Sequence, residues 1–309
     1  MIEDNQIQAK VSPFAMRKGE IKVFDGKDGY VSMNQIIQKI NIGHISEVHF
    51  GILKFINKFE FLTSRQLFQL LKMENYEIKD QDKLNNKLEQ LIKNKILTRY
   101  YFTSEEGNGI YRVYCMEKMG KYLLTSRELE CNWQPSDNAK PVEMIKKKLA
   151  GNQLIIAYMR KSQYLTNYTL KPVITAKEAS KKFKATVLME YTYDKKKYNF
   201  IFEAIRREEN WEDKLIERMK LWKDFYDNFV PGDSEFSALP QLVFLSEDNM
   251  HSAEIFKLLL MKKVNIEKIT HYFTTDLAQN EENLAKSLYD FALEGGKYKL
   301  RNVEAKILG

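Results

Sequence analysis

The segment from Asp80 to Ile96 carries amide and lysine side chains on one side of a predicted helix. The amides are Asn85, Asn86 and Gln90, and the lysines are Lys83, Lys87 and Lys93. A carboxamide holds a donor and an acceptor in one plane, which fits the edge of adenine in the major groove, whereas lysine neutralises phosphate. This face therefore has the chemistry for contacting bases and backbone, although an ordinary solvated face of a lysine-rich chain would have the same composition.

Apolar residues on the other side of the same segment predict the helix that positions these groups. Leu84, Leu88, Leu91 and Ile92 are spaced i, i+4, i+7 and i+8, which lines one stripe of a helix with 3.6 residues per turn. We expect this stripe to pack inward and the amide face to be exposed.

Two further helices are predicted upstream. Ile45, Val48, Ile52, Ile56 and Phe59 keep helical spacing. A short turn later, Thr63 and Gln66 form a T-x-x-Q capping box, which predicts the start of a second helix containing Leu67, Leu70 and Leu71. Three consecutive short helices in this order are typical of a helix-turn-helix unit.

Two strands are predicted downstream, at 97–102 and 110–116, because both segments are rich in aromatic and β-branched residues. Three helices followed by such a hairpin predict a winged helix-turn-helix. Arg99 and Arg112 lie on the hairpin and are expected to contact phosphate, whereas Glu105 and Glu106 near its tip would repel it. The partner predicted is double-stranded DNA; a winged helix that binds only protein is the alternative.

The length of the chain, 309 residues, favours two domains. We expect an N-terminal arm and lead-in at 1–44, a winged helix-turn-helix at 45–129, a linker at 130–140 and an α/β domain with a mixed sheet at 141–309. The second domain is predicted to contain a hairpin at 185–205, a helix at 211–229, strands at 239–245 and 266–274, and a last helix at 283–293. The whole chain is therefore predicted to be an α+β or α/β protein.

The composition of the chain limits the cellular compartment in which we expect the protein and the kinds of catalytic or metal site that it could hold. The apolar runs are too short to span a bilayer and there is no signal sequence, so no membrane contact is expected. Two cysteines provide neither a disulfide framework nor a metal site, which suggests a cytoplasmic location. The four histidines lack metal-ligand spacing, and no phosphate-binding glycine loop is present. We predict no cofactor, no metal and no catalytic residue.

The predicted order of elements in the second domain resembles the PD-(D/E)xK nucleases, with Glu203 in the place of the second acid. Such enzymes need a lysine two positions later and an earlier aspartate on the neighbouring strand. Here Ile205 stands at the lysine position. If Tyr193 pairs with Tyr198, Glu203 faces Leu188 and the aspartate is missing as well. Glu203 is therefore predicted to be an ion-pairing residue beside Arg206, and a Mg²⁺-dependent endonuclease is the alternative.

The segment YNFIFEAIRREENWEDKLIERMKLWKDFYDNF, from Tyr198 to Phe229, together with the predicted winged helix, resembles the replication-relaxation proteins of bacterial conjugative plasmids and integrative elements. Glu203, Arg206 and Tyr226 match the family's acidic strand end, arginine and helix tyrosine, whereas Lys184-Ala185 replaces its Pro-Asp dipeptide. The resemblance implies a sequence-specific DNA-binding accessory factor of replication or relaxation, or a transcriptional regulator. A relaxase or replication protein is the implied partner, a scaffold for such a protein is the third interpretation, and a homodimer is compatible with all three.

Overall fold

The computed structural model describes residues 12–105, 107–175, 181–231, 236, 238–264, 266 and 269–309, and at 108–110 it describes the backbone alone. The chain divides into two compact units. The N-terminal unit is Arg17–Asn152, and the C-terminal unit is Gln153–Gly309 together with the residues up to Met16.

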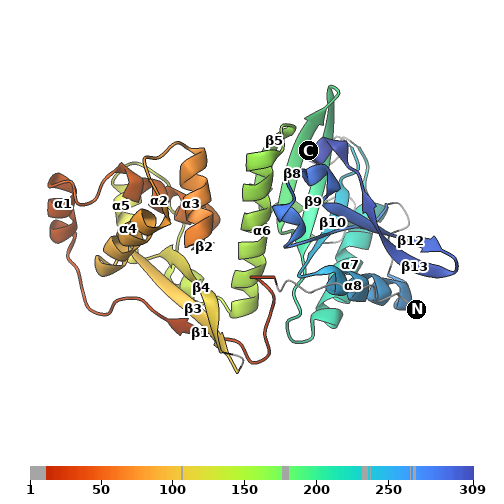
Figure 1. The fold of residues 1–309 in the computed structure, drawn as a ribbon, viewed down its shortest axis with the longest axis horizontal. Helices are drawn as coiled ribbons and strands as arrows, with labels where there is room; N and C mark the ends of the chain where they lie inside the picture. Colours follow the sequence, from red (N-terminus) through yellow and green to blue (C-terminus); the bar gives the residue numbers. More distant parts are fainter. Residues whose placement is uncertain are drawn as a thin grey trace. The chain divides into compact units, whose positions relative to one another are not determined.

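The N-terminal unit contains the helices and the hairpin that the sequence predicts (Figure 1). Its elements are β1 (Ile21–Phe24), α1 (Met33–Asn41), α2 (Glu47–Phe59), β2 (Leu62–Thr63), α3 (Ser64–Met73), α4 (Gln81–Lys93), β3 (Leu97–Ser104), β4 (Gly107–Met116), α5 (Lys118–Thr125), the 3₁₀ turn η1 (Pro135–Ala139) and the first part of α6 (Val142–Lys161). Strands β3 and β4 are longer than expected.

Capping residues fix where these helices begin. The Thr63 hydroxyl accepts from the backbone N–H of Gln66, and the Gln66 side chain accepts from the N–H of Thr63, so the predicted capping box of α3 is confirmed. Asp80 caps α4 by accepting from the N–H of Lys83 at 2.8 Å. Each contact satisfies an N–H group that the first turn of a helix leaves without a partner.

Strand β1 lies within the segment that the sequence assigns to an arm and lead-in. It pairs antiparallel with β3, from Ile21 opposite Thr103 to Phe24 opposite Tyr100. The sheet therefore has the order β1-β3-β4-β2. A four-residue strand is too short to show a hydrophobic period, and its pairing partner lies far along the chain.

The boundary between the units lies within α6, whereas the sequence places a linker at 130–140. Gln66 donates a hydrogen bond to the carbonyl of Leu149, and Asn152 donates to the carbonyls of Phe59 and Phe61. Residues 130–140 also belong to the N-terminal unit, since the Lys22 ammonium group binds the carbonyls of Asn138 and Lys140. The stretch that contains Pro135, Ser136 and Asn138 is here an ordered connection rather than a linker.

The C-terminal unit is a mixed seven-stranded sheet with helices, which confirms an α/β domain with a mixed sheet. After the second part of α6 come β5 (Leu165–Leu170), β6 (Val173–Ile174), β7 (Phe183–Lys184), β8 (Val187–Tyr193), β9 (Lys196–Ala204), α7 (Trp211–Asp227), β10 (Gln241–Ser246), α8 (Asn249–Met261), β11 (Tyr272–Thr275), η2 (Ala278–Asn280), η3 (Leu284–Lys286), β12 (Leu288–Glu294), β13 (Lys297–Val303) and η4 (Lys306–Leu308). The strand order is β13-β12-β11-β10-β9-β8-β5. Strands β9, β10 and β11 are parallel.

Opposite faces of this sheet pack against different helices. Leu188 and Ile201 belong to a core cluster with Leu215 and Trp222 of α7. On the other face, the ring of Tyr158 in α6 contacts those of Tyr191 and Phe202. Burial is therefore nearly continuous over the first half of β8 and the second half of β9, as expected for strands that are covered on both faces.

Two sequence-based expectations for this unit are wrong. The helix expected at 283–293 is a 3₁₀ turn followed by β12, which pairs with β13 across Gly295-Gly296. The hairpin of β8 and β9 is shifted by two residues, because Tyr193 pairs with Lys196 rather than with Tyr198. Asp194 and Lys195, with φ values of 47° and 60°, form a two-residue turn. Both conformations are left-handed, as a type I′ turn requires.

Candidate functional site

The amide-bearing face of α4 is exposed. Leu84, Leu88 and Leu91 are fully buried, whereas Lys83, Asn85, Asn86, Gln90 and Lys93 are exposed and Lys87 is half-buried. The helix therefore presents its polar residues to solvent, as its apolar period predicts. Asn94, which follows the helix, is buried and accepts a hydrogen bond from Lys39, so it is not part of this face.

Hydrogen bonds within the unit orient two of the three amides. His49 Nδ1 accepts from the N–H of Ser46 at 3.0 Å, so the proton is on Nε2, which donates to Gln90 Oε1 at 2.8 Å. Burial lowers the pKa of His49, although the bond to Gln90 opposes this shift. Gln81 donates to Asn85 Oδ1 at 3.3 Å. Within the described residues, the Asn86 amide has no hydrogen-bond partner.

The two hairpin arginines are held by acids that the sequence analysis did not identify. Asp25 Oδ2 lies 2.9 Å from Arg99 Nε and 2.6 Å from Arg112 Nε, and Glu89 also pairs with Arg99. Burial alone would lower the pKa of Arg99, but Glu89 and Asp25 together raise it. The Arg99 side chain is 14% exposed and that of Arg112 is 56% exposed. Arg99 is thus engaged within the unit, and Arg112 keeps access to solvent.

Glu203 is buried and forms an ion pair with Arg218 of α7, with 2.6 Å between Oε1 and Nε. The sequence correctly predicts an ion-pairing carboxylate but wrongly names Arg206 as its partner. The two-residue shift of the hairpin puts Thr186 opposite the end of β9, where its hydroxyl accepts from the N–H of Ala204. Arg218 also lies over the ring of Phe183, 4.5 Å from its centre.

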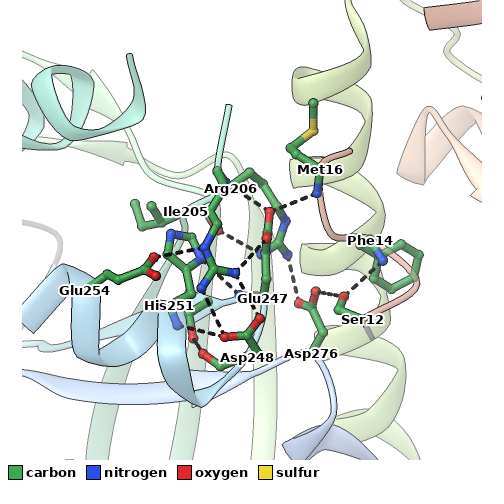
Figure 2. Close-up of polar contacts among 12 residues, drawn as sticks. Ser12, Phe14, Met16, Ile205, Arg206, Glu247, Asp248, His251, Glu254 and Asp276 are labelled. Carbon is green, nitrogen blue, oxygen red and sulfur yellow. Dashed lines mark hydrogen bonds and ion pairs between the residues drawn. The ribbon is translucent and has the colours of Figure 1, made fainter. Parts of the chain in front are cut away.

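A second group of polar residues, which we call the strand-end cluster, gathers where β9, β10 and β11 end (Figure 2). Arg206 Nη2 donates to Asp276 Oδ1 at 2.8 Å, and both side chains are fully buried. Ser12 donates to the other oxygen of Asp276. Glu247 Oε1 accepts from the backbone N–H groups of Met16 and Arg207, each at 3.0 Å. Carboxylates at the ends of two strands thereby hold the segment Ser12–Met16.

Arginine side chains neutralise most of the acids in the strand-end cluster. Arg207 binds Asp248 at 2.9 Å, Glu254 at 2.9 Å and Glu247 at 3.3 Å. Burial would lower the pKa of Arg207, but the hydrogen bonds and charges of Asp248 and Glu254 raise it. Burial raises the pKa of Asp276 to about 6, and Arg206 and Ser12 oppose that shift. These ion pairs join the residues that follow β9 to those that follow β10 and to α8.

His251 completes the strand-end cluster. Burial, followed by the charges of Arg207 and Arg206, lowers its pKa to about 3. The ring packs edge-on against Trp211, with 4.9 Å between the ring centres. Across the described ranges, no three His, Cys, Asp or Glu side chains are grouped so that they could hold a metal ion.

The sequence does contain a signal for the strand-end cluster. Arg206-Arg207 follows β9, Glu247-Asp248 follows β10 and Asp276 follows β11. Because the carboxyl ends of adjacent parallel strands meet at one edge of a sheet, charges after three such strands converge. The cluster was missed because the parallel pairing of these strands was not predicted.

No protein-family model matches the chain, and no curated protein matches it. Among solved structures, it is similar to the restriction endonuclease FokI, with a TM-score of 0.25 and 11% sequence identity. The match covers 75% of this chain and 43% of that one, so it spans less than half of FokI. A similarity this low assigns neither a fold family nor an activity. In the described part of the chain, no helix is long and apolar enough to cross a membrane.

Proposed function

We propose that the N-terminal unit is a winged helix-turn-helix that binds double-stranded DNA in a sequence-specific manner, with α4 in the major groove. The observation that carries the proposal is the polarity of α4, which has leucines buried on one side and exposed Asn, Gln and Lys on the other. The order of three short helices and a hairpin supports it.

The roles of the side chains follow from their surroundings. Asn86 is the principal base-contacting residue in this proposal, because its exposed amide is not committed elsewhere in the described residues. Asn85 and Gln90 contact bases with one end of the amide while Gln81 and His49 hold the other. Lys83, Lys87, Lys93 and Arg112 contact phosphates. Arg99 is assigned to positioning the hairpin, since Glu89 and Asp25 neutralise it.

For the C-terminal unit, we propose a nuclease-like domain that does not cleave DNA. The order α6-β5-β8-β9-α7-β10 of the large sheet and its helices, with the small β6-β7 sheet inserted after β5, supports the likeness. The pairing of Glu203 with Arg218 supports the lack of catalytic chemistry. The whole protein would then be an accessory factor of replication or relaxation, or a transcriptional regulator, of a plasmid or integrative element in the cytoplasm. A relaxase or replication protein is the proposed partner of this unit.

The test is selection of bound fragments from a random duplex pool by the full chain, at two salt concentrations. We expect a defined sequence to be enriched at both. Asn86→Ala should relax the preference at one position by about 1–3 kcal/mol, because it removes a bidentate contact to a base. Lys87→Ala should weaken binding to every sequence and reduce the salt slope by about one, because it removes a phosphate contact.

Lys257→Ala is the matched control, because Lys257 is an exposed helical lysine in the other unit. It should change neither the selected sequence nor the salt slope. Failure to enrich any sequence, or an unchanged preference in both α4 variants, would overturn the proposal.

A further inference from the structure

The Gln90 side chain is exposed, yet one end of its amide is bound to a buried residue. Gln90 lies one turn after Asn86 and three residues before Lys93, so it shares the outer side of α4 with both. Its Oε1 lies 2.8 Å from Nε2 of His49, which is 1% exposed near the start of α2. Among the described residues, the amide nitrogen of Gln90 has no hydrogen-bond partner. The buried contact therefore decides which end of the amide faces solvent.

The backbone of Ser46 determines which nitrogen of His49 carries the proton. Its N–H group is a donor and lies 3.0 Å from Nδ1, so Nδ1 is an acceptor without a proton. Burial lowers the pKa of His49, the bond to Gln90 opposes that shift, and the charge of Lys87 adds to it, so the ring is neutral at pH 7. A neutral imidazole whose Nδ1 is an acceptor has its proton on Nε2.

The proton on Nε2 fixes the direction of the Gln90 amide. Because Nε2–H donates, the end of the amide that faces it is the carbonyl oxygen, and a reversed amide would place N–H donors against each other. The NH₂ group is therefore the end that points away from His49. The bond from Gln81 to Asn85 has no such effect, because both partners are amides and can reverse together.

We propose that Gln90 offers its NH₂ group to the DNA and recognises guanine, and that His49 is the positioning residue that sets this preference. The inference rests on the proposed function of α4. In the major groove, guanine has two adjacent acceptors, O6 and N7, whereas adenine has an amino group beside its N7 and cytosine has an amino group alone. An unrestrained glutamine prefers adenine, because the two ends of its amide match N6 and N7. His49 removes that match.

The test is selection of bound fragments from a random duplex pool by the full chain, compared between the wild type, Gln90→Ala and His49→Phe. Gln90→Ala identifies the position that Gln90 contacts, because the preference at that position is lost. There the wild type should favour guanine over adenine by about fivefold or more, the lower end of the discrimination given by paired base contacts. His49→Phe keeps a ring but removes the donor, so the amide can reverse and the preference should move to adenine.

Nitrogen NMR of the wild-type chain without DNA is a second measurement that needs no variant to fold. At pH 7 it should show His49 with a proton on Nε2 and none on Nδ1. His44→Phe is the matched control, because His44 is an exposed histidine of the same unit whose side chain has no hydrogen bond among the described residues. It should leave the selected sequence unchanged. A loss of stability in His49→Phe would not by itself change which base is preferred at one position.

Three outcomes would each overturn the inference: a preference for adenine over guanine at the Gln90 position in the wild type, an unchanged preference in His49→Phe, or a proton on Nδ1. With a selected sequence that still responds to Asn86→Ala, these outcomes leave the proposed function standing. A chain that enriches no sequence overturns the proposed function, and the inference with it.

Discussion

At the scale of single residues, hydrogen bonding decides which polar groups remain available to a partner. Gln90 and Asn86 lie one turn apart on α4, yet His49 holds one end of the Gln90 amide and Asn86 has no such bond among the described residues. Arg99 and Arg112 both pair with Asp25, but Arg99 also pairs with Glu89 and its side chain is 14% exposed, against 56% for Arg112. The sequence identifies these side chains, but their availability depends on residues up to 87 positions away.

His251 gives a pH-dependent prediction at this scale. Its pKa is about 3 in the folded protein and 6.5 in its ordinary state. Between these values the unfolded chain binds more protons than the folded one, so the stability that neutral His251 contributes is lost as pH falls. His251→Gln removes this dependence. Urea unfolding of both proteins at pH 7.5, 6 and 5 should show that the free energy of unfolding of the wild type falls, relative to that of the variant, at each lower pH. A difference in unfolding free energy that is constant with pH would contradict it.

At the scale of elements, the amphipathic helices and the β8–β9 hairpin were predictable because their cores are local in sequence. Leu84, Leu88 and Leu91 alone define the buried side of α4. Pairings that depend on distant residues were not predictable. Strand β1 is recognised only by its pairing with β3, and β12 only by its pairing with β13. The two-residue turn at Asp194-Lys195 lacks the glycine that signals such turns, which explains the wrong register.

The pairing of Glu203 on β9 with Arg218 on α7 gives a prediction at this scale. Arg218→Met leaves the buried Glu203 carboxylate without its arginine, which should lower the free energy of unfolding by about 3 kcal/mol. Glu203→Leu combined with Arg218→Met should recover most of that loss, because the buried carboxylate is then removed together with the arginine. Chemical unfolding of both variants measures this. Equal destabilisation by the single and double variants would show that the ion pair is not what joins the strand to the helix.

At the scale of the whole molecule, a single helix supplies residues to both units. Ile145 and Leu149 of α6 are fully buried in the N-terminal unit, and Tyr158 of the same helix is fully buried in the C-terminal unit. Local composition cannot show this, because Pro135 and the polar residues around it suggest a linker before α6 begins. The position of the domain boundary is set by the hydrophobic core, N-terminal or C-terminal, in which the side chains of each turn of α6 are buried.

Fragments that end at different points test this boundary. The fragment 17–140 lacks Ile145 and Leu149, and burial of two such side chains contributes at least about 4 kcal/mol, comparable to the whole stability of a small domain. We therefore expect 17–140 to be largely unfolded and 17–152 to unfold cooperatively, as measured by thermal denaturation and near-UV circular dichroism. The fragment 17–161 is the control, and its thermal midpoint should match that of 17–152, because the last turns of α6 belong to the other unit. A folded 17–140 would instead place the boundary at 130–140, where the sequence alone puts it.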